Sequence, residues 1–363
     1  MILSKNQSLQ VKGAAVMLLL FHHLFSASWV NTYNVDSLIF PRETLLDVAY
    51  AGRVCVWVFA FISAYGITVL FMQKEQDVSL LRFTYKRWLP LMSAFWFIYP
   101  LVFILYVILG RTPFSSIYQN NFLFVLADFF GLSNLFGLPT LTGVWWYICF
   151  AQLSLIVLPV LICICRKIEW LALPFFFLLV QYVPQDVGIA SRPSGNYLQY
   201  VPVMIIAVLC AVQGQKRASE NTERSERTLV KVIVALVLFF AFSVLRYFTA
   251  QSDFAYKSFR LPWFLFSLAA WMFVYCVSRI SAKGVVRVLA FFGKHSGNMF
   301  FIHIFFVVLA GEYVYISGNV FLTWLTLFAV SLLTSVLIEG AKHLLRYDRL
   351  VAFLKNKQGV STK

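Results

Sequence analysis

Residues Val11–Trp29 read VKGAAVMLLLFHHLFSASW, and this stretch decides the class of the protein. It is an almost continuous apolar run, and about 20 such residues are enough to cross a lipid bilayer as a helix. His22 and His23 lie near its middle, where an imidazole needs protein, water or substrate around it. An ionisable side chain inside a span marks a functional site by default. We therefore predict a membrane helix that carries chemistry.

Lys12 shares a helix face with His23. The two residues are eleven positions apart, and eleven steps of about 100° bring them within roughly 20° of one face, about 16 Å apart along the axis. His22 is turned about 100° away. This spacing favours His23 as a general base, with His22 as a possible supporting residue. The alternative is a histidine that only hydrogen-bonds between helices.

The composition excludes an ordinary soluble protein. Of the 363 residues, 61% are hydrophobic and only 12% are charged, whereas soluble domains carry about 25% charge. Long apolar runs recur along the chain, while a β-barrel would show short alternating segments. We predict an all-α polytopic membrane protein that forms a single domain over residues 1–363. The six cysteines all fall inside apolar runs, so we expect neither a disulfide framework nor a metal site.

Ten transmembrane spans are predicted from the apolar runs. A further apolar segment, Asn121–Gly137, is short and contains Asp128, so we interpret it as a re-entrant or interfacial helix. The predicted spans are 10–29, 46–72, 88–109, 144–165, 169–184, 198–213, 230–249, 262–279, 297–314 and 319–341.

The basic residues indicate the orientation. With a cytoplasmic N-terminus, 23 of the 30 Lys and Arg residues lie on the cytoplasmic side, six lie on the opposite side, and Arg53 remains within a span. Because cytoplasmic loops carry the basic excess, we expect both termini in the cytoplasm and a cell-membrane location, in bacteria the inner membrane. The net charge of +15 is then explained by the membrane orientation of the chain and does not indicate nucleic-acid binding. Residues 214–231 read as a polar linker and 342–363 as a tail.

Arg53 lies seven residues into the second predicted span. Since a guanidinium stays charged, it needs a carboxylate, a water-filled cavity or an anionic ligand at that depth. A functional role and snorkelling to the outer interface both remain open, and Asp47 is a possible partner.

A basic cluster precedes the third span. Arg82, Lys86 and Arg87 come just before Pro90 on the side where Lys12 also opens. Guanidinium groups bind phosphate in a bidentate manner, so the cluster is either a phosphate-binding mouth or ordinary positive flanking.

Two later segments also contain polar groups. In FFGKHSGNMFFIHIFF, residues Gly293, Ser296 and Gly297 read as the turn that starts the ninth span, which places His303 inside the span and His295 in a solvated loop. In TGVWWYICFAQLSL, we interpret Trp145, Trp146 and Tyr147 as an outer aromatic belt, with Gln152 inside the span.

These pieces, in this order, resemble the acyltransferase 3 family of integral membrane acyltransferases. The family opens with Arg-x10-His, which corresponds here to Lys12-x10-His23. Its second span carries a phrase like VPLFFFLSGYGL, which is similar to Val56–Ile67 with Ala64 in place of glycine. The family's RxxR-I-x-P motif is matched in its second half by Arg87–Pro90, but Thr84 stands where the first arginine is usual. The WxL segment is matched by Trp145–Leu153, and the late G-x-x-S…H motif by Gly293, Ser296 and His303.

The resemblance implies transfer of an acyl group, usually acetyl, from acetyl-CoA to a hydroxyl of a surface polysaccharide or of its lipid-linked precursor. It implies that His23 deprotonates the acceptor or carries the acyl group, and that Arg53 orients the acceptor or stabilises an oxyanion. The CoA-binding residues would be Lys12, Arg82, Lys86 and Arg87 at the phosphates, with His303 beside the pantetheine arm. The expected partners are acyl-CoA, a glycan acceptor and membrane lipid. A transporter or flippase of anionic or glycan lipids is the main alternative, and a membrane scaffold is the third.

Overall fold

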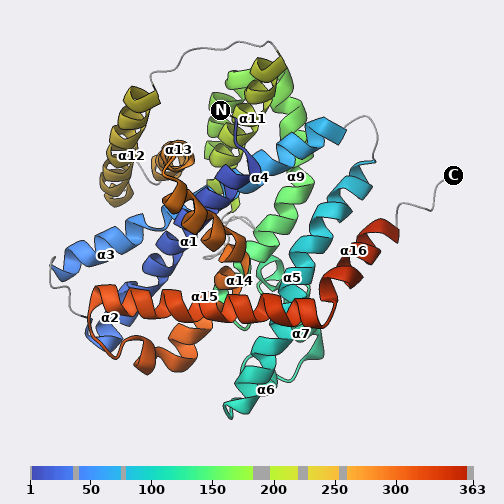
Figure 1. Cartoon of the computed structure of the whole chain (residues 1–363), viewed down its shortest axis with the longest axis vertical. Helices are drawn as coiled ribbons and strands as arrows, with labels where there is room; N and C mark the ends of the chain where they lie inside the picture. Colours follow the sequence, from blue (N-terminus) through green and yellow to red (C-terminus); the bar gives the residue numbers. More distant parts are fainter. Residues whose placement is uncertain are drawn as a thin grey trace.

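The fold is a bundle of helices (Figure 1). The computed structural model describes residues 2–35, 41–74, 79–182, 197–219, 228–252 and 260–357, and within these ranges the chain forms helices and connecting turns but no sheet. The all-α class predicted from the composition is confirmed.

The chain order runs through long helices joined by short helical turns. They are α1 (Lys5–Leu24), α2 (Ala27–Tyr33), α3 (Arg42–Ala51), α4 (Val54–Lys74), α5 (Leu80–Ile108), α6 (Pro113–Ser116), α7 (Phe122–Phe129), α8 (Ser133–Phe136), η1 (Gly143–Trp145), α9 (Trp146–Ile168), η2 (Glu169–Leu171), α10 (Ala172–Tyr182), η4 (Tyr197–Tyr200), α11 (Val201–Ser219), α12 (Thr228–Gln251), α13 (Leu261–Ser278), α14 (Lys283–Val314), α15 (Val320–Leu344) and α16 (Tyr347–Lys357).

The number of long apolar helices is smaller than the ten predicted spans. In the described ranges, eight helical segments are long and apolar enough to cross a membrane, and a ninth results if α1 and α2, bent by 59°, form one span. The difference is at 169–184, where α10 has eleven residues and is about 16 Å long, too short to cross a bilayer by itself.

The two long helices on either side of α10 in the sequence, α9 and α11, run in the same direction. At one end of the bundle, Trp146 in α9 stacks on Tyr200 before α11, with ring centroids 5.5 Å apart. At the other end, Glu169 after α9 pairs with Lys216 of α11, with Oε1 and Nζ 2.6 Å apart. Helices α9 and α11 are therefore parallel, with the short helix α10 between them in the sequence.

Three other predicted segments can be compared with the structure. Asn121–Gly137 contains only the short helices α7 and α8, which confirms that it is not a full span. The predicted linker 214–231 is shorter than expected, because α11 continues to Ser219 and α12 begins at Thr228; its residues 220–227 lie outside the described ranges. The predicted tail contains the last turn of α15 and the helix α16, and its residues 358–363 also lie outside.

Two glycines bring α1 and α14 into backbone contact. A Cβ atom at Gly13 would overlap the carbonyl oxygen of Leu289, and one at Gly293 would overlap the carbonyl oxygen of Leu9. Small residues at a membrane helix interface allow this close approach, since packing and not hydrophobicity drives association in lipid. The contact sets the register of the two helices, with Gly13 beside Gly293.

A buried polar network joins α14 to α15. Lys342 is 6% exposed, and its Nζ donates to Glu339 Oε1 at 2.8 Å and to Asn298 Oδ1 at 3.2 Å. Asn298 Nδ2 also donates to Glu339 at 2.7 Å. Close by, Tyr347 of α16 donates to the carbonyl of Ser93 in α5 at 2.9 Å. These bonds fix the last helices against the bundle.

Candidate active site

The register of α1 and α14 brings two histidines together in the bundle. Because Gly13 meets Gly293, residues ten positions further along two parallel helices meet as well, and these are His23 and His303. Their ring centroids are 4.9 Å apart. His22 is 5.0 Å from His23 on the other side. Three imidazoles thus form one cluster.

The hydrogen bonds of His303 determine its tautomer. Its Nδ1 lies 3.1 Å from the carbonyl oxygen of Met299 and 2.9 Å from that of Phe300. Since carbonyl oxygens only accept, Nδ1 carries the hydrogen. The other nitrogen, Nε2, is then a lone-pair acceptor; it is buried and has no hydrogen-bond partner among the residues that the structure describes. The whole side chain is 0% exposed, whereas His23 keeps part of its surface accessible.

His22 points to a different neighbour. Its Nδ1 lies 2.9 Å from the carbonyl oxygen of Ala49 in α3 and therefore donates to it. A Cβ at Gly52 would lie 3.5 Å from the His22 Cβ, an ordinary van der Waals contact, so this turn packs directly against His22. The structure thus separates the pair as the helix geometry predicts, with His22 toward α3 and His23 toward α14.

Arg53 lies within the candidate span Arg42–Gln73, as the sequence predicts, at a turn that divides this span into two helices. The span predicted from residue 46 begins at Arg42, and α3 ends at Ala51 before α4 starts at Val54. Gly52 and Arg53 form the turn between them. The Arg53 guanidinium is within electrostatic reach of His22, His23 and Tyr200. Asp47, the suggested partner, is exposed on α3.

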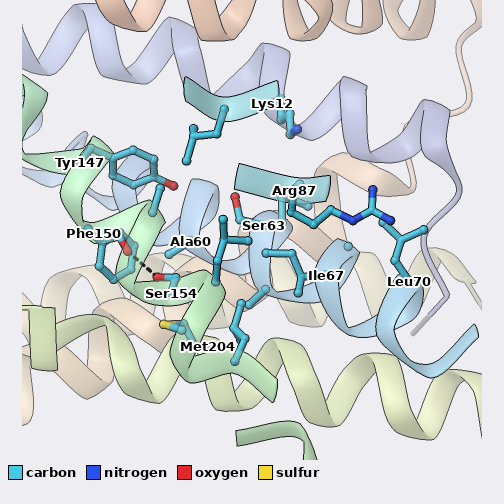
Figure 2. Close-up of a pocket in the computed structure, with 17 residues that line it drawn as sticks. Lys12, Ala60, Ser63, Ile67, Leu70, Arg87, Tyr147, Phe150, Ser154 and Met204 are labelled. Carbon is cyan, nitrogen blue, oxygen red and sulfur yellow. Dashed lines mark hydrogen bonds between the residues drawn. The ribbon is translucent and has the colours of Figure 1, made fainter. Parts of the chain in front are cut away.

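A cavity of about 270 Å³ opens between α1, α4, α5, α9 and α11 (Figure 2). Its walls are mostly aliphatic and aromatic, and its polar groups are few. Figure 2 shows Lys12 and Arg87 in the upper right part of the view, Ser63 near the centre and the Tyr147 ring at the left. Ser63 and the Tyr147 hydroxyl are within hydrogen-bonding reach of each other. The cavity is therefore mostly apolar, and two cations, Lys12 and Arg87, are part of its lining.

Only some of the predicted phosphate-binding residues line the cavity. Lys12 and Arg87 both line the cavity, although they come from helices far apart in the sequence. Among the residues that the structure describes, Arg82, Lys86 and His303 are not part of its lining. The Arg87 guanidinium lies 5.5 Å from the centre of the Phe83 ring.

Aromatic rings lie between the cavity wall at Tyr147 and the histidine cluster. Tyr147, in the cavity wall, has its ring centroid 5.3 Å from that of Phe300. Phe300 in turn is 6.3 Å from the His303 ring. One aromatic layer therefore separates the cavity from the imidazoles.

The interpretation of the tryptophans as an outer belt is wrong. Trp145 is 3% exposed, and its Nε1 donates to the carbonyl of Phe301 in α14 at 3.1 Å. Trp146 stacks on Tyr200. Gln152 has a structural partner as well, because Trp88 Nε1 donates to its Oε1 at 2.7 Å. The aromatic residues hold α9 inside the bundle, where the indole N–H groups of Trp145 and Trp88 each find an acceptor.

The expected turn before His303 is also wrong. Helix α14 begins at Lys283, so Gly293, Ser296 and Gly297 are internal helical residues. His295 is 5% exposed and not solvated, with its Nδ1 2.9 Å from Ser335 Oγ. Gly293 has a packing role instead, in contact with α1.

With this geometry established, comparison with known proteins assigns the family. An acyltransferase domain matches residues 9–340, nearly the whole chain. The chain belongs to the acyltransferase 3 family. No curated protein and no solved structure matches the sequence. The chain is therefore a multi-pass membrane acyltransferase.

The sequence of this acyltransferase identifies His23, His303, Lys12 and Arg87 as candidate site residues. It does not predict that His23 contacts His303, or that Lys12 and Arg87 line the same cavity. One signal was available: Gly13 precedes His23 by the same interval, ten residues, as Gly293 precedes His303. Two equal glycine-to-histidine intervals are what two parallel helices in tight contact need. Ser63 also lines the cavity, within hydrogen-bonding reach of the Tyr147 hydroxyl. Among the described residues, no three His, Cys, Asp or Glu side chains are placed to share a metal ion.

Proposed function

We propose that this acyltransferase moves an acetyl group from acetyl-CoA to a hydroxyl of a cell-surface polysaccharide or of its lipid-linked precursor. The observation that carries the proposal is the cavity lined by both Lys12 and Arg87, whose wall residue Tyr147 contacts Phe300 beside the histidine cluster. Two cations suit the phosphates of CoA, and apolar walls suit the pantetheine arm and the acetyl group. We place the cation-bearing end in the cytoplasm, where the donor is found.

His23 is the proposed base. It lies on the Lys12 face of α1, and unlike His303 it is partly accessible. His23 takes the proton of the acceptor hydroxyl while the oxygen attacks the thioester carbonyl. The carbon–sulfur bond then breaks, and the CoA thiolate leaves with the proton from His23. In the alternative order, His23 attacks first, and an acyl-histidine passes the acetyl group to the acceptor.

Arg53 is proposed to act on the acceptor side. It lies within electrostatic reach of both His22 and His23, and a guanidinium there offers hydrogen bonds to a hydroxyl or to the developing oxyanion. His22, held by Ala49, supports the geometry of the cluster. Arg82 and Lys86 remain proposed as outer contacts for phosphate, beyond the cavity lining.

The test is acetyl transfer by purified protein in lipid nanodiscs, with isotopically labelled acetyl-CoA and glycan extracted from a deletion strain. We expect the deletion strain's glycan to lack an acetyl mass increment, which the wild-type protein restores. His23→Ala should lose roughly 10²–10⁴-fold in rate. His343→Ala is the matched control, because His343 is exposed at the end of α15. Full activity of His23→Ala would remove the proposed mechanism, and glycan transport without acetyl transfer would favour a flippase.

A further inference from the structure

We propose that His303 is a positioning residue for His23: it offers a fixed, buried lone pair that accepts a hydrogen bond from the His23 ring and stabilises His23 once it is protonated. The inference rests on the proposed function, since it assigns a second residue to the same base. It comes from the meeting of α1 and α14, which the two glycines enforce.

The first step is the state of His303. Its Nδ1–H is committed to the carbonyls of Met299 and Phe300, so the ring cannot flip its tautomer without losing both bonds. Nε2 is consequently an acceptor, and within the described part of the chain it is buried without a partner. A buried acceptor that stays unsatisfied costs free energy. Such an atom, in a side chain that is 0% exposed, points to a hydrogen-bond donor that arrives during the reaction.

The second step is the source of that donor. The nearest ring is His23, with its centroid 4.9 Å away and its plane tilted by 46°. A rotation of the His23 side chain is enough to aim one of its N–H groups at the His303 lone pair. Neutral His23 then presents its other nitrogen, which is unprotonated, to the acceptor hydroxyl. This fixes the tautomer that a general base requires.

The third step is the balance of charge around the protonated base. The ionisable groups that face His23 are His303 from α14, His22 from α1 and Arg53 from the turn between α3 and α4. Arg53 is a cation and opposes the protonation of His23. His22 directs its Nδ1–H to Ala49 and lies on another face of α1. His303 therefore supplies the acceptor that compensates the proton taken up by His23.

Three substitutions of one residue test the proposal. His303→Gln keeps an acceptor near the position of Nε2, His303→Asn keeps a donor near the position of Nδ1, and His303→Phe keeps the ring but no polar atom. We expect the Gln variant to stay within about tenfold of wild-type kcat, and the Asn and Phe variants to lose more than tenfold. The affinity for acetyl-CoA should be unchanged in all three, because His303 does not line the cavity.

The pH profile separates this role from a purely structural one. An acceptor that stabilises protonated His23 raises the pH at which the base loses its proton. Without it, the acidic limb of kcat/KM should move to lower pH in His303→Phe, and the Gln variant should follow the wild type. Equal losses in the Gln and Phe variants, or an acidic limb that does not move, would overturn the proposal.

A measurement on the wild-type protein guards against variants that fail to fold. Nitrogen chemical shifts of ¹⁵N-histidine-labelled protein, assigned with His22→Gln and His343→Ala, report which nitrogen carries each hydrogen. We expect His303 to be protonated at Nδ1 and to stay so with acetyl-CoA bound, and a proton on Nε2 instead would overturn the proposal. If wild-type protein transfers no acetyl group at all, the proposed function fails, whereas the tautomer of His303 is still measured.

Discussion

At the scale of single residues, we expect the two cations that line the cavity to contribute to acetyl-CoA binding, and the histidines to contribute to the chemical step. Lys12 and Arg87 come from α1 and α5 and meet at one cavity. A hydrogen bond to a charged group is worth about 1.5–3 kcal/mol. We therefore expect Lys12→Ala or Arg87→Ala to raise KM for acetyl-CoA roughly tenfold or more, with little change in kcat, in steady-state transfer assays.

The control for this prediction is Lys5→Ala. Lys5 is also on α1, but it is exposed and does not line the cavity. The prediction would be wrong if Lys5→Ala and Lys12→Ala raised KM equally, since a general loss of positive charge would then explain both.

Asp128 is a residue whose effect on stability should depend on pH. It is 3% exposed and accepts hydrogen bonds from the Tyr118 hydroxyl at 2.6 Å and from the Leu141 amide at 2.9 Å. Burial raises the pKa of the Asp128 carboxyl above its usual range, and the hydrogen bonds only partly oppose this. The folded protein thus holds the proton more tightly than the unfolded chain, so this carboxyl's contribution to stability is lost as pH rises through its folded pKa.

The measurement is thermal unfolding of wild type and Asp128→Asn in detergent, from about pH 5 to about pH 8. We expect the Tm advantage of the wild type over Asp128→Asn to shrink as pH rises. A Tm difference that is constant over this range would show that the carboxyl does not titrate there.

At the scale of helices, the contact between α1 and α14 is the element that assembles the site. Gly13→Ala or Gly293→Ala would push a Cβ into the backbone of the partner helix. We expect a loss of about 1–3 kcal/mol in stability, as for other overpacked interfaces, together with a loss of transfer activity, because His23 and His303 move apart. Thermal unfolding and acetyl transfer by the same preparations measure both effects.

Gly297→Ala is the matched control in the same helix. Nothing lies within 4 Å of a Cβ at Gly297, and alanine is a better helix former than glycine. This variant should keep its activity and unfold at the same or a higher temperature. If Gly297→Ala were as damaging as Gly293→Ala, helix flexibility and not close packing would be the cause.

The sequence identified most of the long apolar helices but not which of them are neighbours. Apolar run length identified the spans, since the bilayer sets that length. The Lys12–His23 spacing identified a helix face, because it depends only on helical geometry. The pairing of His23 with His303 could not be predicted in this way, since it depends on which helices touch. The Trp145 error has the same origin: an indole near a helix end serves a lipid interface or a buried carbonyl equally well.

At the scale of the whole molecule, the proposal depends on orientation. The donor is cytoplasmic, so the end of the bundle that carries Lys12 and Arg87 has to face the cytoplasm. The basic bias in the sequence predicts this, with both termini on that side.

Cysteine labelling in sealed cells tests the orientation. In a background with the six native cysteines replaced, Lys5→Cys and Asn356→Cys represent the two ends, and Ser115→Cys represents the loop after α5; all three side chains are exposed. We expect a membrane-impermeant maleimide to label Ser115→Cys in intact cells, and to label the other two only after the membrane is opened. If Lys5→Cys were labelled in intact cells, Lys12 and Arg87 would face away from cytoplasmic acetyl-CoA, and the donor would have to enter from the opposite end of the bundle.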